Sequence, residues 1–564
     1  MKYSKLFGKT IKTVPANFAL TSHKLLHQGG FVRQVSAGRY AFLPLGQRVM
    51  SKIATIIEEE MAAIGSQQLT TPIMQPLEIW KVTNRDKAFG EEMHLVDDHH
   101  GATFALGATA EGVMVELVKS FKPSYKDLPL YIHQFTSKFR DEKRPRGGIL
   151  RVREFTMKDA YSFDVSEEAA FKSYQLFFDA YLKIAKRLGL EVYPTMADSG
   201  AIGGDYNHEF IVPSEAGETE ALLCDHCDYA SQVERAEGKF NTYPQDKKMK
   251  EVKEFWDDTV VNCELLARRM GVPVHTTTKT IMFKADGKFV AAMVRGDYDI
   301  NETKLKKHLG CDSLALATEE EIAQVTGAKV GFVGPINLPD TVLVIADLTC
   351  QDRVNFEAGG NKSGLHLYNL NYEQDIKTPG FYDLRKVSAG DGCVKCGPGK
   401  LKLVNGIEWG HCFKLDTFYS VPHQGVFTDK SGVEKPIWMG SYGIGLGRSM
   451  ATVVETHHDD RGMAWPESIA PYQLHLVGVN LEEADVLSKA EATYHELLKQ
   501  KVEVLFDDRE GVSAGEKFAD ADLVGCPFRA VVSKKTGDKI EIKKRTEKTP
   551  KLVSLRELLD LLGV

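Results

Sequence analysis

The segment that decides the fold is YIHQFTSKFRDEKRPRGGILRVREFTM, residues 131–157. Residues 131–142 and 150–157 each have the composition of a strand. A basic loop that contains Pro and Gly separates them, and these residues interrupt strands and favour turns. The segment therefore predicts an antiparallel hairpin with a long loop, although such a hairpin by itself is most often a solvated, salt-bridged surface.

The charged residues of this hairpin are those of a nucleotide site. Side chains alternate along a strand, so we expect Arg140 and Glu142 to share one face of the first strand. On the returning strand, Arg151, Arg153 and Phe155 share a face by the same rule. A guanidinium group can clamp a phosphate, a carboxylate can accept a hydrogen bond from the adenine amino group, and a ring can stack on the base.

Two other segments extend this site along the chain. The sequence LGATAE (106–111) precedes the hairpin, and GSYGIGLGR (440–448) comes much later. The glycine run does not have the spacing of the dinucleotide fingerprint and is a weak signal alone. Its glycines allow close packing where a strand meets a helix, and that helix could aim Arg448 at a phosphate. Apolar residues at helical spacing predict a further helix over 46–64.

Length and composition limit the classes of protein that remain. The chain has 564 residues, which suffices for three or four domains, and 43% hydrophobic and 26% charged residues are typical of a folded protein. No apolar run approaches the roughly 18 residues of a membrane helix, and no secretory signal is visible, so we expect a cytoplasmic protein without membrane association. The net charge of −7 excludes a generally basic nucleic-acid binder, so nucleic acid must meet local basic patches.

A separate set of predicted strands and helices begins after the first of two Cys-x-x-Cys pairs. Residues 228–392 contain their own predicted strands and helices and lie between the two pairs, which predicts an inserted domain. Residues 1–227 and 393–466 would then form one discontinuous domain. After a proline-containing linker, strands and helices alternate over 470–564, which predicts a compact α/β domain.

Together these segments resemble the ordered motifs of class II aminoacyl-tRNA synthetases. The helix at 46–64 with Pro72 resembles motif 1, the dimer-forming element, and residues 139–155 and 443–448 resemble motifs 2 and 3. Three longer stretches are similar to bacterial-type prolyl-tRNA synthetases: RQVSAGRYAFLPLG (33–46), REFTMKDAYSF (153–163) and DDREGVSAGEKFADADLVGCP (507–527). The resemblance implies an α+β catalytic core with an antiparallel sheet, an inserted α+β editing domain and a C-terminal α/β anticodon-binding domain.

The resemblance also implies that proline is activated with ATP and Mg²⁺ and then transferred to tRNA(Pro). By position, Arg140 would bridge the proline carboxylate and the α-phosphate. Glu142 would read adenine, and Phe155 would stack on it. Among the remaining cations, Arg448 would hold the γ-phosphate and Arg151 would also face the phosphates.

The proline site implied by the resemblance contains Thr109, Glu111, Arg140 and His411. A positively charged secondary amine is matched by a carboxylate and a hydroxyl acceptor, which Glu111 and Thr109 supply. His411 lies in a segment that resembles the one closing over the amino-acid pocket, and a packed core histidine is the alternative.

Two positions depart from the family pattern. Ala108-Thr109-Ala110-Glu111-Gly112 stands where the family has Pro-Thr-His-Glu-Glu, so the rigidity of this loop is in question. Gly148 stands in the motif 2 loop where the family often has a bulky residue. We therefore expect weaker contacts from that loop to ATP or to the tRNA acceptor end.

Four of the nine cysteines form the two pairs, Cys224, Cys227, Cys393 and Cys396. Two such pairs are the ligand set of a structural zinc site. They would meet at the root of the insert if the chain enters and leaves it through adjacent strands. The alternative is four reduced, buried cysteines.

The insert resembles the editing domain of this family, which is related to free-standing deacylases of mischarged tRNA. A pocket sized for proline admits alanine, because missing methylenes give only ~1–3 kcal/mol of discrimination each, and a second hydrolytic site would remove alanyl-tRNA(Pro). The matching positions are Lys279, Gly331, Pro335, Asp347 and His366. Lys279 would hold the tRNA end and His366 would bind or orient the substrate; without the resemblance, a surface lysine and a packed histidine are the simpler interpretation.

The C-terminal domain resembles the family's anticodon-binding domain. Asp507, Asp508 and Arg509 follow a strand and would read exposed anticodon bases. Residues 534–551 contain eight Lys or Arg against three acidic residues, which offers phosphate contacts. A solvated hairpin is the alternative for these lysines.

The resemblance therefore implies a homodimeric member of the prolyl-tRNA synthetases with an editing domain, and two alternatives remain open. A class II synthetase for another amino acid, such as threonine, is disfavoured by the Thr109–Glu111 site and by the anticodon-domain motif. A non-catalytic tRNA-binding relative would be expected to lose Arg140, Glu142 or Arg448, and all three are present.

Overall fold

The structure, a computed structural model, describes residues 1–197, 200–204, 206–377 and 379–564, which divide into two compact units. The core unit comprises residues 1–194, 199–219 and 405–564, and the insert unit comprises 195–198 and 220–404. The insert unit thus extends beyond the expected 228–392 at both ends, and it contains both cysteine pairs.

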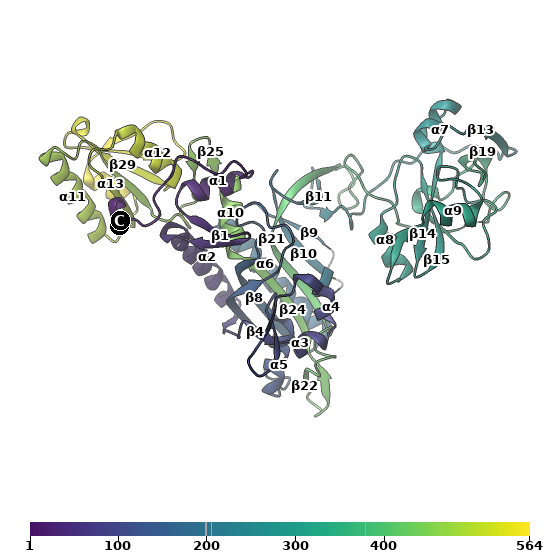
Figure 1. Ribbon diagram of the computed structural model, residues 1–564, viewed down its shortest axis with the longest axis horizontal. Coiled ribbons are helices and arrows are strands. Elements are labelled where there is room, and N and C mark those ends of the chain that lie inside the picture. Colours follow the sequence, from purple (N-terminus) through teal and green to yellow (C-terminus); the bar gives the residue numbers. More distant parts are fainter. Residues whose placement is uncertain (198–199, 205, 378) are drawn as a thin grey trace. The chain divides into compact units, whose positions relative to one another are not determined.

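An antiparallel sheet forms the centre of the core unit (Figure 1). Within the core unit, six of its strands pair in the order β10 (Tyr206–Pro213), β21 (Leu401–Asp416), β24 (Trp438–Gly445), β8 (Glu154–Asp164) and β7 (Leu130–Phe139), with the short β3 (Gln67–Gln68) parallel to β7. Strand β21 begins in the insert unit and ends in the core unit. This sheet, with its helices, confirms the expected α+β core with an antiparallel sheet.

Alternating side chains give the two faces of this sheet different roles. Tyr442 and Ile444 of β24 are fully buried in the hydrophobic core with helices α2 (Pro44–Ala63), α6 (Glu167–Arg187) and α10 (Leu446–Thr456). The Tyr442 ring stacks on Phe177 of α6, with the ring centroids 3.9 Å apart. The intervening residues Ser441 and Gly443 face the other way and line a cavity. The period of two therefore separates the packed face from the site face.

The hairpin strands differ from the sequence prediction in their bounds. β7 ends at Phe139 and β8 begins at Glu154, so Arg140, Glu142, Arg151 and Arg153 all lie in the connecting loop. The alternation rule therefore does not govern them, because it applies only where the backbone is paired.

Helix α6 begins with a serine cap. The Ser166 side chain accepts a hydrogen bond from the backbone N–H of Ala169. Asp164 lies two residues before this cap and accepts instead from the Ser173 hydroxyl at 2.7 Å.

The C-terminal part of the core unit is a five-stranded mixed sheet. Its strands are ordered β28 (Val504–Asp507), β27 (Leu474–Gly478), β29 (Phe528–Val532), β30 (Ile540–Lys544) and β31 (Lys551–Val553). The first three are parallel, and helices α11 (Ala484–Lys499), α12 (Ala514–Val524) and α13 (Leu555–Leu561) accompany them. This confirms the expected C-terminal α/β domain, and β30 with β31 forms the basic hairpin.

The insert unit contains two further sheets (Figure 1). The larger has the order β16 (Leu314–Leu316), β14 (Thr278–Ala285), β15 (Lys288–Arg295), β17 (Leu343–Asp347) and β20 (Gly380–Tyr382). The smaller has the order β13 (Lys253–Trp256), β19 (Leu365–Leu370) and β18 (Phe356–Gly359). Asp286 and Gly287 connect β14 to β15 with positive φ values of 45° and 82°, the conformation that a two-residue hairpin turn requires.

Candidate functional site

A cavity of about 840 Å³ opens on the site face of the core-unit sheet. Phe155 and Met157 of β8, Ser441 and Gly443 of β24, and His411 of β21 line it. This volume suits a nucleotide together with a small amino acid. Every residue that was expected to bind ATP or proline lines this cavity, namely Thr109, Glu111, Arg140, Glu142, Arg151, Phe155, His411 and Arg448.

Arg140 lines the cavity and carries one unsatisfied donor. Its guanidinium lies 5.6 Å from the centroid of the Phe155 ring, and its Nη2 makes one long contact of 3.4 Å to the carbonyl of Ala108. Its Nε is buried and has no hydrogen-bond partner among the described residues. Burial and the charge of Arg448 lower the pKa of Arg140. A half-buried cation with an unsatisfied donor favours an anionic ligand at this position.

The motif 2 loop is cross-linked by ion pairs. Arg151 Nη2 lies 2.8 Å from Glu142 Oε2, and Arg151 Nη1 donates to Glu218 at 2.9 Å. Arg153 was expected beside Arg151, but it donates to the backbone carbonyl of Glu142 and pairs with Asp141 outside the cavity lining. Arg153 therefore holds the loop, while Arg151 faces the cavity.

The part of the cavity that is expected to bind proline is built around a buried carboxylate. Glu111 is 1% exposed, and its oxygens accept hydrogen bonds from Thr109 at 2.7 and 2.8 Å, from Ser441 at 3.0 Å and from Arg85 at 2.8 Å. Burial acts to raise the pKa of Glu111, but the Arg85 charge and the Thr109 hydrogen bond outweigh it, so the pKa is lowered. The carboxylate is therefore charged at neutral pH. Sequence reasoning missed Arg85, because it lies in no recognisable motif.

Arg448, which lines the same cavity, lies beside Glu408 of an acidic cluster. Arg448 donates to the backbone carbonyl of Glu408 at 2.9 Å and lies 3.4 Å from its carboxylate. Glu209, Glu408 and His411 bring their ligand atoms within 4.8 Å of one another. Burial favours protonation of Glu408, but His411, Arg448 and Arg140 lower its pKa to about 2. Sequence reasoning missed Glu408, although it lies three residues before His411.

At both positions that depart from the family pattern, the structure shows contacts that suit the residue present. Tyr161 accepts the Ala110 backbone N–H at 3.1 Å and anchors the loop without a His side chain. A Cβ at Gly112 would lie 2.7 Å from Ile79, so this position admits no larger residue without movement. Gly148 has a φ of +63°, and a Cβ there would lie 2.8 Å from the His23 ring. At Gly112 and Gly148, therefore, neighbouring side chains leave no room for a Cβ atom.

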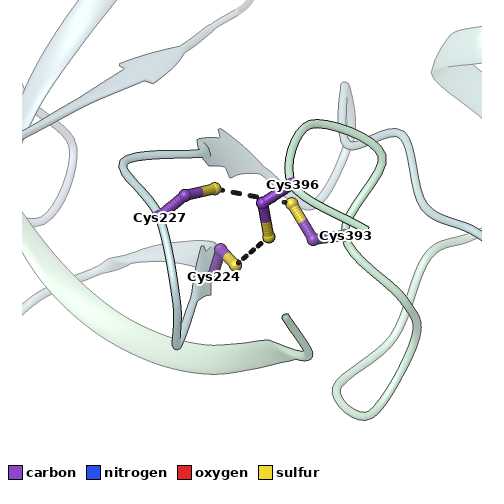
Figure 2. A group of neighbouring side chains, drawn as sticks. All are labelled: Cys224, Cys227, Cys393 and Cys396. Carbon is purple, nitrogen blue, oxygen red and sulfur yellow. Dashed lines mark hydrogen bonds between the residues drawn. The ribbon is translucent and has the colours of Figure 1, made fainter. Parts of the chain in front are cut away.

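The four paired cysteines converge in the insert unit (Figure 2). The Sγ atoms of Cys224 and Cys396 are 3.6 Å apart and those of Cys227 and Cys393 are 3.7 Å apart. All four sulfurs lie within 4.8 Å of one another. A tetrahedral zinc with bonds of ~2.3 Å separates its sulfurs by roughly 3.8 Å, so the arrangement matches the ligand shell of zinc.

The expected editing residues fall into two groups. The loop of Gly331 and Pro335 lies near His366 at its Phe332, whose ring packs against the His366 ring at a centroid distance of 5.3 Å. His366 is 2% exposed; its Nε2 contacts the Val260 carbonyl at 2.9 Å, and its Nδ1 has no partner among the residues that the structure describes.

Lys279 and Asp347 lie on the larger sheet of the insert unit. Lys279 Nζ pairs with Asp299 and donates to the Tyr298 carbonyl at 3.0 Å. Asp347 is buried, and its carboxylate accepts from Thr349 and from the backbone N–H groups of Leu384 and Arg385. These bonds join β17 to the chain that follows β20.

The expected anticodon-reading residues form one network. Asp507 is fully buried and accepts from Arg509 Nε at 2.9 Å and Nη2 at 2.6 Å. Asp508 accepts from the backbone N–H and the hydroxyl of Ser4 at 2.8 and 2.6 Å. The Arg509 guanidinium lies 4.3 Å from the Tyr3 ring centroid. Asp507 thus orients Arg509 instead of presenting its own oxygens.

No helix among the described residues is both long and apolar enough to cross a membrane.

Comparisons with known proteins cover the whole chain. Residues 257–376 match the family model described as an aminoacyl-tRNA editing domain, and residues 473–563 match an anticodon binding domain. The proline–tRNA ligase of Caldicellulosiruptor saccharolyticus is 42% identical over 563 residues, covering 100% of this chain and 98% of that protein. The proline–tRNA ligase of Moorella thermoacetica is 44% identical over 562 residues, covering 98% and 96%.

The fold also matches a solved structure. Giardia lamblia prolyl-tRNA synthetase in complex with prolyl-adenylate superposes with a TM-score of 0.57 at 15% identity, over 95% of this chain and 73% of that one. At this identity the match concerns the fold alone. The identity and coverage of the curated relatives decide the family: the chain belongs to the proline–tRNA ligases, with an inserted aminoacyl-tRNA editing domain and an anticodon-binding domain.

Proposed function

We propose that this chain activates proline with ATP and transfers it to the 3′ end of tRNA(Pro). One observation carries the proposal. The half-buried Arg140, whose Nε has no partner among the described residues, shares one cavity with the Thr109–Glu111 site and Arg448. A cation in this place is suited to a carboxylate and a phosphate that must react with each other.

The residues of the cavity account for each part of the reaction. Glu111 and Thr109 hold the proline ammonium, and Arg140 binds its carboxylate and the α-phosphate of ATP. A carboxylate oxygen of proline attacks the α-phosphorus, the bond to the β-phosphate oxygen breaks, and pyrophosphate leaves. Arg140 stabilises the charge that develops, so no side-chain nucleophile is needed.

The nucleotide is held by residues around Arg140. Phe155 stacks on adenine, and Glu142 accepts from its amino group. Arg151 and Arg448 face the phosphates, Arg448 at the γ-phosphate. In the second step the terminal hydroxyl of tRNA attacks the prolyl carbonyl and AMP leaves.

We also propose the residues that hold Mg²⁺. Glu209 and Glu408 supply carboxylate oxygens, the ligands that Mg²⁺ prefers. The lowered pKa of Glu408 keeps it charged beside Arg448. The ion would neutralise phosphate charge when ATP is bound.

The insert supplies the second activity, hydrolysis of alanyl-tRNA(Pro). Lys279 would hold the tRNA end, and Gly331, Pro335, Asp347 and His366 would form or support the site. The tight contact between Phe332 and His366 supports a common site for the loop and the histidine.

A structural zinc bound by Cys224, Cys227, Cys393 and Cys396 completes the insert unit. The sulfur spacing supports it, and so does Gly399, where a Cβ would lie 2.3 Å from Cys224 Sγ. The chain that packs over the sulfurs thus requires glycine. Zinc would tie the two ends of the insert to each other.

The proposed partners follow from the same family. Arg509, oriented by Asp507, would contact anticodon bases together with Asp508, and the basic hairpin β30–β31 would contact phosphates. A homodimer is supported by exposed apolar side chains on the sheet of β4 (Met74–Pro76), β6 (Thr103–Leu106) and β5 (Leu95–Asp97), among them Met74 and Leu95. The cytoplasm, which holds ATP and tRNA, would be the place of action.

Pyrophosphate exchange measured with each of the standard amino acids tests the function. The proposal requires exchange that depends on proline and is weak or absent with the others. Exchange that depends on threonine or another amino acid would favour a different class II synthetase. No exchange with any amino acid would favour the non-catalytic relative.

A further inference from the structure

A single asparagine clamps the Gly331–Pro335 loop of the insert unit. Asn361 lies between β18 and β19 and is 7% exposed. Its Oδ1 accepts the Gly334 N–H at 2.8 Å, and its Nδ2 donates to the Gly334 carbonyl at 3.1 Å and to that of Ile336. The side-chain amide therefore pairs with the loop as a neighbouring strand would pair.

The loop depends on this pairing for its backbone hydrogen bonds. Residues 332–334 have no regular secondary structure, and a buried backbone group without a partner is costly. The Asn361 backbone N–H adds a further bond to the Phe332 carbonyl at 3.0 Å. Asn361 thus bonds to the loop at Phe332 and Gly334, and to Ile336 directly after it.

The residue type follows from two requirements that asparagine meets together. Asn361 has a φ of 54°, in the left-handed region, which asparagine tolerates better than most residues. The site also needs one acceptor and two donors on a short side chain. Aspartate has the same shape but would turn carboxylate oxygens toward two backbone carbonyls.

The clamped loop lies against the end of β18 and against the editing histidine. A Cβ at Gly334 would lie 1.6 Å from the Gly359 carbonyl, so the two backbones are in direct contact. Phe332 packs on His366, and a Cβ at Gly331 would lie 3.0 Å from Val261, next to the Val260 carbonyl that His366 contacts. Movement of the loop would therefore disturb His366.

From this geometry we infer that Asn361 is a positioning residue for hydrolysis of mischarged tRNA. Asn361 holds the loop in place and, through Phe332, holds the His366 ring in its position. The inference rests on the proposed editing function. Since most of the binding free energy of a tRNA substrate comes from contacts far from its terminal ester, a displaced loop should lower kcat and leave KM nearly unchanged.

The test measures deacylation of preformed alanyl-tRNA carrying the proline anticodon by the full-length chain. Asn361→Gly permits the same φ but removes all three side-chain bonds, and we expect kcat to fall at least about tenfold. Asn361→Asp keeps the bond from the Gly334 N–H, and its kcat should fall between those of wild type and Asn361→Gly. Proline-dependent pyrophosphate exchange should be unchanged in both variants, because it takes place in the core unit.

Asn369→Asp is the matched control. Asn369 also has a positive φ, of 65°, in the insert unit, but its side chain donates to the Glu251 carbonyl and, among the described residues, makes no bond to residues 331–336. Its kcat for deacylation should equal that of wild type. Hydrogen exchange of residues 331–336 should accelerate in Asn361→Gly while the rest of the insert unit stays protected.

The outcomes separate the inference from the proposed function. Deacylation by wild type with equal kcat in both Asn361 variants would overturn the positioning role. Loss of protection across the whole insert unit in both variants would also overturn it, because Asn361 would then be a general stability residue. Absence of deacylation in wild type would instead overturn the editing function itself.

Discussion

Arg85 Nη1 lies 2.8 Å from Glu111 Oε2, and both side chains are almost completely buried, at 3% and 1% exposure. The pair stands beneath the site proposed for the proline amine. Arg85 compensates the buried charge of Glu111 and leaves the carboxylate ionised, so that it can attract a second cation, the substrate. Arg85 acts on proline through Glu111.

Arg85→Met should weaken proline binding and the fold together. Removing one partner of a buried ion pair costs ~3–5 kcal/mol, because the other charge stays buried without compensation. The pKa of Glu111 would rise, and the KM for proline in pyrophosphate exchange should increase at least about tenfold. The KM for ATP should change much less.

Arg187→Met provides the comparison for stability. Arg187 pairs with Glu59 and Glu60 on an exposed surface, where ion pairs contribute about 0–1 kcal/mol. Equal losses of unfolding free energy in the two variants, or an unchanged KM for proline in Arg85→Met, would show that the buried pair does not support the site.

Site residues that lie in a recognisable sequence motif were predicted correctly to line the cavity. Site residues that only tertiary contacts bring together were not predicted. Arg140, Glu142, Phe155 and Arg448 lie in recognisable segments, and all line the cavity. Arg85 could not be found, because its role depends on a buried contact between residues 26 positions apart.

Local sequence does not show tertiary packing, and this explains why Arg153 in the hairpin loop and Asp507 in the C-terminal domain were placed differently from the structure. Strand periodicity cannot tell where pairing stops, so Arg153 was placed beside Arg151 although it lies before β8 begins. Asp507 was expected to face bases, but burial of its carboxylate against Arg509 depends on tertiary packing that local sequence does not show.

The cysteine cluster should hold about one zinc ion per chain. Cys396→Ser should lose the metal and lower the melting temperature of the insert unit, because zinc ligation contributes directly to folding. Cys311→Ser is the control, since Cys311 is not in the cluster and is partly exposed. Elemental analysis after dialysis measures the metal content; a metal-free wild-type chain with the stability of Cys396→Ser would exclude the site.

We expect Glu357 to make the insert unit less stable at higher pH. Glu357 is 6% exposed, its Oε2 has no partner in the described part of the chain, and burial raises its pKa to about 7. The folded state binds the proton more tightly than the unfolded state, whose pKa is near 4.5. Stability from this group is therefore full below pH 4.5 and is lost as the pH rises through 7.

Glu357→Gln should remove this dependence. At pH 8 the variant should be more stable than wild type by up to about 3 kcal/mol, the equivalent of the change from 4.5 to about 7, and the difference should shrink toward pH 5. Hydrogen exchange of the insert unit across this pH range measures it. A constant difference between the two chains at all pH values would contradict the assignment.

The central claim is that the core unit activates proline while the insert unit hydrolyses mischarged tRNA. The direct measurement is proline-dependent pyrophosphate exchange beside alanyl-tRNA deacylation on the same preparations of Arg140→Ala and Lys279→Ala, with Lys284→Ala as a control on the same strand as Lys279. Arg140→Ala should lose exchange by about 100-fold or more and keep deacylation. Lys279→Ala should keep exchange and lose deacylation, and Lys284→Ala should keep both. Loss of both activities in either Arg140→Ala or Lys279→Ala, or retention of both, would contradict the account.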